Sequence, residues 1–239
     1  MDTIKGTKSC KLHEYASRDA LAEALAISVS GVLAGGISAR GSAVLVVSGG
    51  STPKLFFDHL SHCDIEWNKV TIVLDDERIV PADHDRANAK LVAEHLLVNK
   101  AANARFEPYA VDGTSPDECA QRSATLLDQS VRHIDALILG MGTDGHTASF
   151  FPGGDNLDNA LALDNDASVI AMQAEGAGEP RLTLTLPIVL GAHFLALHIE
   201  GAEKQSVLEE ALAGSDIKQM PVRAVFEYTK KPVQIFWAP

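Results

Sequence analysis

Residues 140–149 read Gly140-Met-Gly-Thr-Asp-Gly-His-Thr-Ala-Ser149 and follow a largely apolar run at 134–139. A short run of this kind is typical of a parallel strand that is buried on both faces. The glycines after it allow the backbone to turn tightly and to approach a ligand closely. We therefore expect His146 at the carboxyl end of a central strand, where an open α/β sheet places its binding and catalytic groups.

The same glycines also fit a dinucleotide-binding fingerprint. Gly140, Gly142 and Gly145 match the pattern G-x-G-x-x-G, and an acidic residue, Asp164, follows at about the usual spacing of 20 residues. The fingerprint requires a long helix after the third glycine, with its amino end against the pyrophosphate. Pro152 follows too closely for such a helix, because Pro is not tolerated in a helix interior. The sequence therefore predicts no dinucleotide or other cofactor.

Length and composition indicate a globular chain with a sizeable core. The chain has 239 residues, of which 46% are hydrophobic, and it shows no internal repeat, low-complexity segment or linker. We interpret residues 1–239 as a single α/β domain. The formal net charge of −12 argues against nucleic acid or an anionic membrane as a partner. An anionic ligand would need local cations to overcome that charge.

The amino-terminal segment and the cysteines bear on location. Residues 1–12 are polar and lack the apolar centre of a signal peptide, and we expect no apolar run long enough to span a bilayer. The three cysteines, Cys10, Cys63 and Cys119, are widely spaced and odd in number. This fits reduced thiols better than a disulfide framework or a zinc site. The sequence therefore predicts a cytoplasmic protein without a metal.

Strand and helix patterns alternate along the chain. The alternation predicts a Rossmann-like three-layer αβα fold with a mostly parallel central sheet. The first helix is expected to begin after its N-cap, Ser17, and to run to about Leu33, with Gly35 and Gly36 ending it. The expected strands lie at 44–47, 70–74, 134–139, 169–172, 194–199 and 233–237.

Capping residues mark further helices. Thr52 is a suitable N-cap with Pro53 as the first helical residue, and Ser115 begins a capping box with Pro116 behind it. Other helices are expected at 88–99, shortly before Gly191, and from about 201 to Gly214, and a surface loop at 155–166.

The turn after the strand at 44–47 contains Gly49, Gly50, Ser51 and Thr52. It offers free backbone N–H groups at the start of a helix, which is a ready anion site. The turn is not a P-loop, because that motif requires G-x-x-x-x-G-K-[ST]. A simple strand-to-helix turn without a ligand is the alternative interpretation.

Three cations follow or precede expected strands. Arg78, which comes after Asp76 and Glu77, can clamp a phosphate through its guanidinium fork, or can form a surface ion pair with a neighbouring acid. Lys204 lies at a helix start, where a cation opposes the helix dipole unless an anion binds there. Arg181 alone is ambiguous. In a parallel sheet the carboxyl ends of the strands lie on one edge, so these groups can converge.

His146 is one of nine histidines, and the other eight show neither a comparable setting nor metal-ligand spacing. Asp144 precedes it by two residues. That acid can orient the imidazole for general-base catalysis, or can cap the turn through its own backbone.

Five segments occur in order along the chain: Val-Ser-Gly-Gly-Ser-Thr-Pro at 47–53, Asp-Glu-Arg at 76–78, the ten residues at 140–149, Arg-Leu-Thr-Leu-Thr at 181–185 and Gly-Ala-Glu-Lys at 201–204. Together they resemble the ordered motifs of the 6-phosphogluconolactonase family, and they span nearly the whole chain. The segment at 144–149 is specific. The turn at 49–52 is shared with a wider superfamily that includes glucosamine-6-phosphate deaminases and ribose-5-phosphate isomerases.

Two differences favour the lactonase over the deaminase branch. The deaminases carry Tyr where this chain has Arg78, and Phe-Asn-Glu-Pro where it has Ser149-Phe-Phe-Pro152. One departure from the lactonase pattern is Arg86-Ala-Asn88, where the family has Asp-Ser-Asn. Asn88 is kept, so the departure concerns local loop contacts only.

The resemblance implies hydrolysis of 6-phospho-D-glucono-1,5-lactone in the oxidative pentose phosphate pathway, with a small sugar phosphate lactone as the only partner and no metal. It leaves the oligomeric state open and is compatible with a monomer. His146 would act as general base, oriented by Asp144. The oxyanion donors are not assigned from the sequence; glycine N–H groups of the turn at 140–145 are candidates. The phosphate would bind Gly50, Ser51, Thr52, Arg78, Arg181 and Lys204, with Gly49, Asp76, Glu77, Gly142 and Gly145 completing the pocket.

Two alternatives stay open at this point. One is a glucosamine-6-phosphate deaminase/isomerase, which would release ammonia from its substrate. The other is a non-enzymatic sugar-phosphate sensor of the same fold, which would bind product tightly without turnover.

Overall fold

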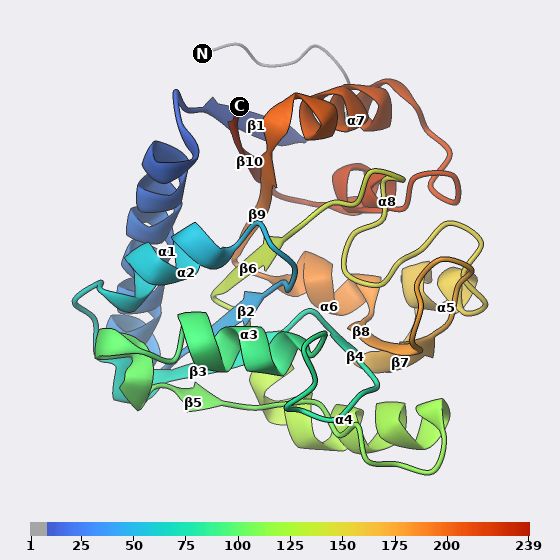
Figure 1. The fold of residues 1–239 in the computed structure, drawn as a ribbon, viewed down its shortest axis with the longest axis horizontal. Helices are drawn as coiled ribbons and strands as arrows, with labels where there is room; N and C mark the ends of the chain where they lie inside the picture. The colour runs from blue at the N-terminus through green and yellow to red at the C-terminus, as the bar shows by residue number, and fades with distance from the viewer. Residues whose placement is uncertain (1–8) are drawn as a thin grey trace.

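A computed structural model describes residues 9–239 and shows a central sheet of seven strands (Figure 1). All neighbouring strands in it are parallel, and β2 and β6 are buried almost throughout, as expected for strands covered on both faces. The predicted helix-flanked, mostly parallel sheet is confirmed. In spatial order the strands are β1 (Cys10–Glu14), β10 (Val233–Ala238), β9 (Phe194–Glu200), β6 (Ala136–Leu139), β2 (Ala43–Val47), β3 (Val70–Leu74) and β5 (Arg105–Phe106).

The path of the chain across the sheet determines where the helices lie. From β1 through β2 and β3 to β5 the chain moves toward one edge, and from β6 through β9 to β10 it moves toward the other. Because such crossovers are right-handed, the two halves place their helices on opposite faces. The first half contains α1 (Arg18–Arg40), α2 (Lys54–Ser61), η1 (Trp67–Lys69), α3 (Asn88–His95) and η2 (Asn99–Asn103). The second half contains α4 (Pro116–Val131), α5 (Leu157–Leu161), α6 (Leu186–Gly191), α7 (Gly201–Ala213) and α8 (Val222–Tyr228).

The chain reverses direction between β2 and β6, which pair at the centre of the sheet. The turn at 48–53 follows β2, and the segment at 140–149 follows β6. Open α/β sheets bind their ligands at such a switch point. Two motifs far apart in the sequence are therefore brought to one place by the topology.

A second, smaller sheet was not predicted. It contains three antiparallel strands, β4 (Asp76–Arg78), β8 (Arg181–Leu184) and β7 (Val169–Met172), in that order. β4 is polar and short, so it has no apolar pattern that would reveal it in the sequence. This sheet positions two of the predicted cation-bearing segments next to each other.

The predicted end of the first helix is wrong. α1 continues through Gly35 and Gly36 and ends at Gly41, whose φ of 83° is left-handed and whose N–H donates to the carbonyl of Ile37 at 2.8 Å. Gly36 is needed inside the helix for packing, since a Cβ there would lie 2.4 Å from a carboxylate oxygen of Asp135. The N-cap Ser17 is confirmed.

Other predicted boundaries are corrected. α2 begins after Pro53 with no side-chain cap, so Thr52 is not its N-cap. The helix expected at 88–99 ends at His95, and the loop expected at 155–166 contains α5. The capping residue Ser115 is confirmed, because its hydroxyl accepts from the N–H of Glu118 at 3.2 Å.

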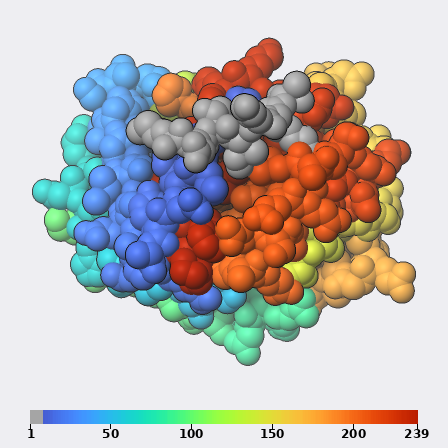
Figure 2. Space-filling view, turned by 90° about the horizontal axis from the view of Figure 1, so that it is seen from above, coloured from blue at the N-terminus to red at the C-terminus, as the bar shows by residue number. Residues whose placement is uncertain are grey.

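The termini of the described chain lie together. β1 pairs with β10, and in Figure 2 the amino-terminal α1 and the carboxyl-terminal segments form adjoining parts of the surface.

By length and composition alone α1 is long and apolar enough to cross a membrane, contrary to our expectation, and 44% of its apolar stretch of 18 residues is buried. A core helix passes the same test, and Leu21, Leu25 and Leu33 of α1 are fully buried. Most of the segment examined for a signal peptide lies outside the described residues.

Candidate active site

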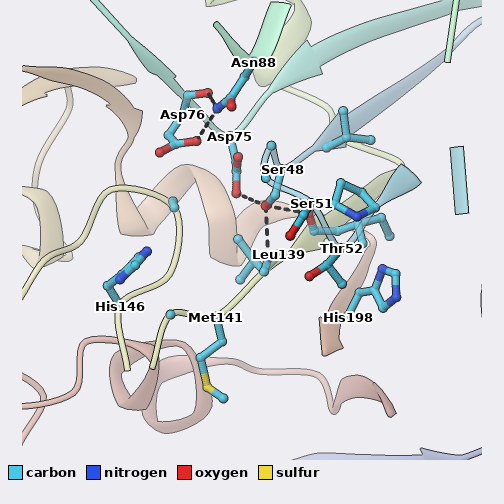
Figure 3. A pocket seen from close by; sticks show the side chains of 18 of the residues that line it. Ser48, Ser51, Thr52, Asp75, Asp76, Asn88, Leu139, Met141, His146 and His198 are labelled. Atoms are coloured by element: carbon cyan, nitrogen blue, oxygen red, sulfur yellow. Dashed lines mark hydrogen bonds between the residues drawn. The ribbon is translucent and has the colours of Figure 1, made fainter. Parts of the chain in front are cut away.

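A cavity of about 370 Å³ opens at the switch point (Figure 3). Figure 3 shows His146 and Met141 on one side of it, Thr52 and His198 on another, and Asp75, Asp76 and Asn88 along its border. Of the predicted site residues, the cavity is lined by Gly49, Gly50, Ser51, Thr52, Asp76, Arg78, Gly142, His146, Arg181 and Lys204.

His146 and Asp144 form a hydrogen-bonded pair. The imidazole Nδ1 lies 2.6 Å from Oδ1 of Asp144, and the same oxygen accepts from the backbone N–H of His146 at 3.1 Å. Burial by itself raises the pKa of Asp144, but the hydrogen bonds and charge of His146 outweigh it and lower the pKa to about 2. Asp144 therefore both caps the turn and holds the ring, with Nε2 as the nitrogen left for other contacts. Asp144 lies behind His146 and does not itself line the cavity.

The tight packing of this pair explains Gly142. A Cβ on Gly142 would lie 2.1 Å from Nδ1 of His146 and 2.5 Å from Oδ1 of Asp144. Gly145 has a φ of 77°, and a Cβ there would collide with Met220, so Gly145 shapes the turn. Contrary to the prediction, it does not line the cavity. Ala148 has a φ of 48°, which is uncommon for a residue with a Cβ.

Phe151 lies between the histidine and one arginine. Its ring centroid is 4.6 Å from that of His146, and Cζ of Arg181 lies 5.6 Å from the same ring. Arg181 is almost fully buried and donates to the carbonyl of Ala177 at 2.6 Å. It lies 4.0 Å from Oδ2 of Asp76. Arg181 is thus held on the histidine side of the cavity.

The turn after β2 has the geometry expected of an anion site. Gly50 has a φ of 92°, and among residues 9–239 none accepts a hydrogen bond from the N–H groups of Gly50, Ser51 or Thr52. Gly49 has no room for a side chain, because a Cβ would lie 1.8 Å from the amide oxygen of Asn88. Three donors are therefore available to a ligand at the start of α2.

Asp76 connects three segments of the site. Its Oδ1 accepts from the Asn88 amide at 2.9 Å, and its Oδ2 accepts from the Ser149 hydroxyl at 2.5 Å. Asn88 packs against Gly49, and Ser149 ends the histidine loop. The carboxylate therefore fixes the anion turn and the histidine loop relative to β4.

Glu77 does not line the cavity, contrary to prediction. It is buried and accepts from the N–H groups of Arg78 at 2.7 Å, Asn88 at 2.8 Å and Ala89 at 2.7 Å. Since the last two lie at the start of α3, Glu77 caps that helix.

The remaining two cations are open to a ligand. The Arg78 guanidinium donates to the carbonyl of Arg86, but its Nε is buried and finds no acceptor within the described chain. Neither Asp75 nor Glu77 forms the ion pair with Arg78 considered above. Burial lowers the pKa of Lys204, against the charges of Glu203 and Asp144, and no hydrogen bond from the described residues contributes.

Several residues that line the cavity were missed, and three of them are polar groups close to the strand ends. His198 is buried in β9, with Nε2 3.2 Å from a carboxylate oxygen of Glu200. Asp75 and Ser48 are hydrogen-bonded to each other at the ends of β3 and β2. β9 is a nearly continuous apolar run without alternation, so the burial of His198 could be expected from its neighbours, but no sequence signal marks the other two.

No group of three His, Cys, Asp or Glu side chains that could hold a metal ion occurs within residues 9–239. A dinucleotide fingerprint requires a long helix directly after Gly145. The next helix in the chain is the short α5, Leu157–Leu161.

Fold and site place the chain among the α/β proteins that bind a ligand at the switch point of a parallel sheet. Within that class, it belongs to the family described as glucosamine-6-phosphate isomerases/6-phosphogluconolactonase, whose model matches residues 16–237.

Individual relatives carry the lactonase name. A 6-phosphogluconolactonase of Rhizobium meliloti is 48% identical over 97% of this chain and 100% of its own length. One of Mesorhizobium japonicum is 45% identical over 94% of both chains. The crystal structure of a 6-phosphogluconolactonase from Shewanella baltica matches with a TM-score of 0.94 and 39% identity, over 100% of both chains.

Proposed function

We propose that this protein hydrolyses 6-phospho-D-glucono-1,5-lactone to 6-phospho-D-gluconate, as a cytoplasmic step of the oxidative pentose phosphate pathway. The observation that carries the proposal is the His146–Asp144 pair, 2.6 Å apart, whose histidine lines a cavity that is also bordered by the turn at 49–52 and by Arg78, Arg181 and Lys204. The lactonase names of close relatives support the same substrate.

In the proposed mechanism, His146 activates water. Neutral His146 accepts a proton from water through Nε2, and the hydroxide attacks the lactone carbonyl carbon. The imidazolium then donates that proton to the ring oxygen as the C–O bond breaks. Asp144 stays ionised and stabilises the imidazolium, because its pKa is about 2.

The phosphate anchors the substrate for this reaction. We assign it to the N–H groups of Gly50, Ser51 and Thr52, together with Lys204 and the guanidinium group of Arg78. Arg181, also expected to bind the phosphate, contacts the same Phe151 ring as His146 and is assigned to the reacting end of the substrate. Such an anchor fixes the carbonyl carbon near the base and makes the attack effectively unimolecular. The cations also offset the net charge of −12, which otherwise disfavours an anionic substrate.

The oxyanion donors need a revised assignment. The N–H groups of Gly140, Gly142 and Gly145 already donate to the Ser48 hydroxyl, the His146 carbonyl and the Gly142 carbonyl. These three N–H groups are therefore not available to bind the oxyanion. Arg181 shares the Phe151 ring with His146, so we assign stabilisation of the oxyanion to its guanidinium.

The decisive experiment follows lactone hydrolysis by the purified protein against the spontaneous rate. Acceleration by the wild type that is lost in His146→Gln supports the proposal. Hydrolysis at the spontaneous rate by the wild type, with tight binding of 6-phosphogluconate, would indicate a sensor, and release of ammonia from glucosamine 6-phosphate would indicate a deaminase.

A further inference from the structure

Asp75 is a buried carboxyl group that the proposed mechanism does not use. It follows β3 directly, is fully buried, and lines the cavity. Its Oδ2 contacts the Ser48 hydroxyl (Figure 3), whereas its Oδ1 is buried without a hydrogen-bond partner among residues 9–239. A carboxylate oxygen buried in this way would be costly, because burying a charge requires partners that satisfy it.

The contacts of Ser48 indicate where the protons are. Its Oγ lies within hydrogen-bond distance of Oδ2 of Asp75, 3.0 Å from the carbonyl of Ile138 and 3.0 Å from the N–H of Gly140. A hydroxyl has one proton to donate and two lone pairs. If Asp75 were ionised, both its Oδ2 and the carbonyl of Ile138 would be acceptors for the one hydroxyl proton of Ser48. One of these two oxygens would then face a lone pair of Ser48 without a proton between them.

A proton on Oδ2 of Asp75 resolves the conflict. Asp75 then donates to Ser48, Ser48 donates to Ile138, and Ser48 also accepts from the N–H of Gly140, so all three contacts are satisfied. The bare Oδ1 becomes a neutral carbonyl oxygen, which costs less to bury than a carboxylate oxygen.

We propose that Asp75 is a positioning residue that works as a neutral carboxylic acid: through Ser48 it fixes the start of the histidine loop, and it keeps a second negative charge out of the cavity. The benefit of keeping charge out of the cavity rests on the proposed function, because it assumes an anionic substrate.

The link from Asp75 to the histidine loop is continuous. Ser48 holds the N–H of Gly140, and the carbonyl of Gly140 accepts from the Thr147 hydroxyl at 2.7 Å. Thr147 is the neighbour of His146 in the chain. Asp75 also anchors the second sheet, since its carbonyl accepts from the N–H of Leu184 at 2.9 Å.

The surroundings of Asp75 favour the protonated form. Burial raises its pKa well above the ordinary value of 3.8, and the charge of Asp76 raises it further. The Ser48 contact and the backbone N–H groups of Asp75 and Asp76 lower it, but they do not outweigh the burial. Tyr109, from the segment before α4, donates to the carbonyls of Leu74 and Asp75 and not to the carboxyl group. The other titratable or charged groups bordering the cavity are Arg78, Arg86, His146, Arg181, His198 and Lys204.

The test is the pH dependence of unfolding in wild type and Asp75→Asn, measured in urea from pH 5 to pH 9. A raised native pKa gives stability that is complete below pH 3.8 and is lost as pH rises toward the native value. Asp75→Asn has no such proton to lose. We therefore expect the unfolding equilibrium constant of the wild type to grow relative to that of the variant, by up to about tenfold per pH unit. A pH-independent ratio, or one that falls with pH, would overturn the proposal.

Asp135→Asn is the matched control. Asp135 is also buried, but it accepts from the N–H of Val44 at 2.8 Å and pairs with Arg40, so it is satisfied as a carboxylate. This variant should be less stable than the wild type at neutral pH, without the relative gain at high pH. The same gain in both variants would show that the effect is not specific to Asp75.

Two further measurements keep the proposal testable. If Asp75→Asn does not fold, infrared spectroscopy of the wild type at pH 7 with isotope-labelled aspartate must show a protonated carboxyl band that persists in Asp135→Asn; its absence overturns the proposal. Binding of 6-phosphogluconate should weaken at alkaline pH in the wild type and less so in Asp75→Asn, and equal weakening would show that Asp75 does not keep a negative charge out of the cavity. If neither protein binds this product, the proposed function fails while the unfolding result still decides the state of Asp75.

Discussion

Arg78 and Arg181 lie directly opposite each other across the antiparallel pair of β4 and β8. Residues in this arrangement project to the same side of a sheet, and like charges there repel. Asp76 lies near Arg181 at 4.0 Å, yet Nε of Arg78 has no partner in the described chain. An anion bound in the cavity would relieve both the repulsion and the unsatisfied donor, and this supports the proposed binding of the substrate phosphate.

Removing these cations should weaken product binding. Arg78→Ala and Lys204→Ala should each reduce the affinity for 6-phosphogluconate by roughly 10- to 150-fold, because hydrogen bonds to charged groups are worth about 1.5–3 kcal/mol. Calorimetric titration would measure this. Arg132→Ala, which breaks an exposed pair with Asp128, is the control and should bind normally. Unchanged affinity in both test variants would exclude Arg78 and Lys204 from the site.

Gly142 should tolerate no side chain. Gly142→Ala places a Cβ 2.1 Å from Nδ1 of His146, so the pair with Asp144 must separate and turnover should fall by roughly the 10²–10⁴-fold expected when a positioned base is lost. Gly35→Ala is the control, because a Cβ there meets no atom within 4 Å and Gly35 lies in α1, outside the lining of the cavity. Equal turnover in the two variants would mean that the tight packing is unimportant.

Five strands of the central sheet could be predicted because they are short apolar runs between turn residues, and the predicted strand at 70–74 coincides with β3. The edge strands β1 and β5 were missed because Cys10–Glu14 and Arg105–Phe106 are not such runs, and the expected strand at 169–172 belongs to the second sheet. The second sheet could not, because Asp76–Arg78 is polar and becomes a strand only by pairing with Arg181–Leu184. The continuation of α1 past Gly36 likewise depends on Asp135, which is 99 positions from Gly36 in the chain.

The candidate site shows the same division. His146, Thr52, Arg78 and Lys204 follow strands or begin helices, so a parallel sheet brings them together by topology alone. Asp75 reads in the sequence as one acid in a charged turn. Its burial depends on β8, whose Leu184 pairs with its carbonyl, and that contact has no local signature. Glu77 was misassigned because it caps α3 through the N–H groups of Asn88 and Ala89, and this contact also has no local signature in the sequence.

No dinucleotide should bind, in spite of the glycine pattern. The chain after Gly145 contains no long helix to face a pyrophosphate, since α5 has only five residues. Titration with NAD and NADP should give no measurable signal, and lactone hydrolysis should be unchanged in EDTA. A micromolar dissociation constant for either dinucleotide, or activity that chelation removes and a divalent ion restores, would contradict this prediction.

Asp144→Asn should slow turnover. Asp144 is ionised throughout the working range, because its pKa is about 2, so its charge can stabilise the imidazolium that forms when His146 accepts the proton. Without the carboxylate, turnover should fall by less than the roughly 10²–10⁴-fold expected for losing the base. Unchanged turnover in this variant would argue against the pair.

The stability effect of Asp144 has the opposite sign to that of Asp75. A lowered native pKa gives stability that is present above pH 3.8 and lost as pH falls toward about 2. Because the Asp144 side chain is half exposed, this contribution is small, and Asp144→Asn should differ little from the wild type in urea unfolding at pH 7. A large loss at that pH would mean that the rate effect reflects unfolding.

His146→Gln should separate catalysis from binding. Proton transfer by a positioned side chain contributes roughly 10²–10⁴-fold, so turnover should fall by about that factor after spontaneous lactone opening is subtracted. Affinity for 6-phosphogluconate should change little, because the proposed phosphate contacts come from other segments. His133→Gln is the matched control, since that ring is largely exposed and does not line the cavity. Near-full turnover with a normal pH profile in His146→Gln would make His146 structural, and Asp76, which also lines the cavity, would then be the next base to test.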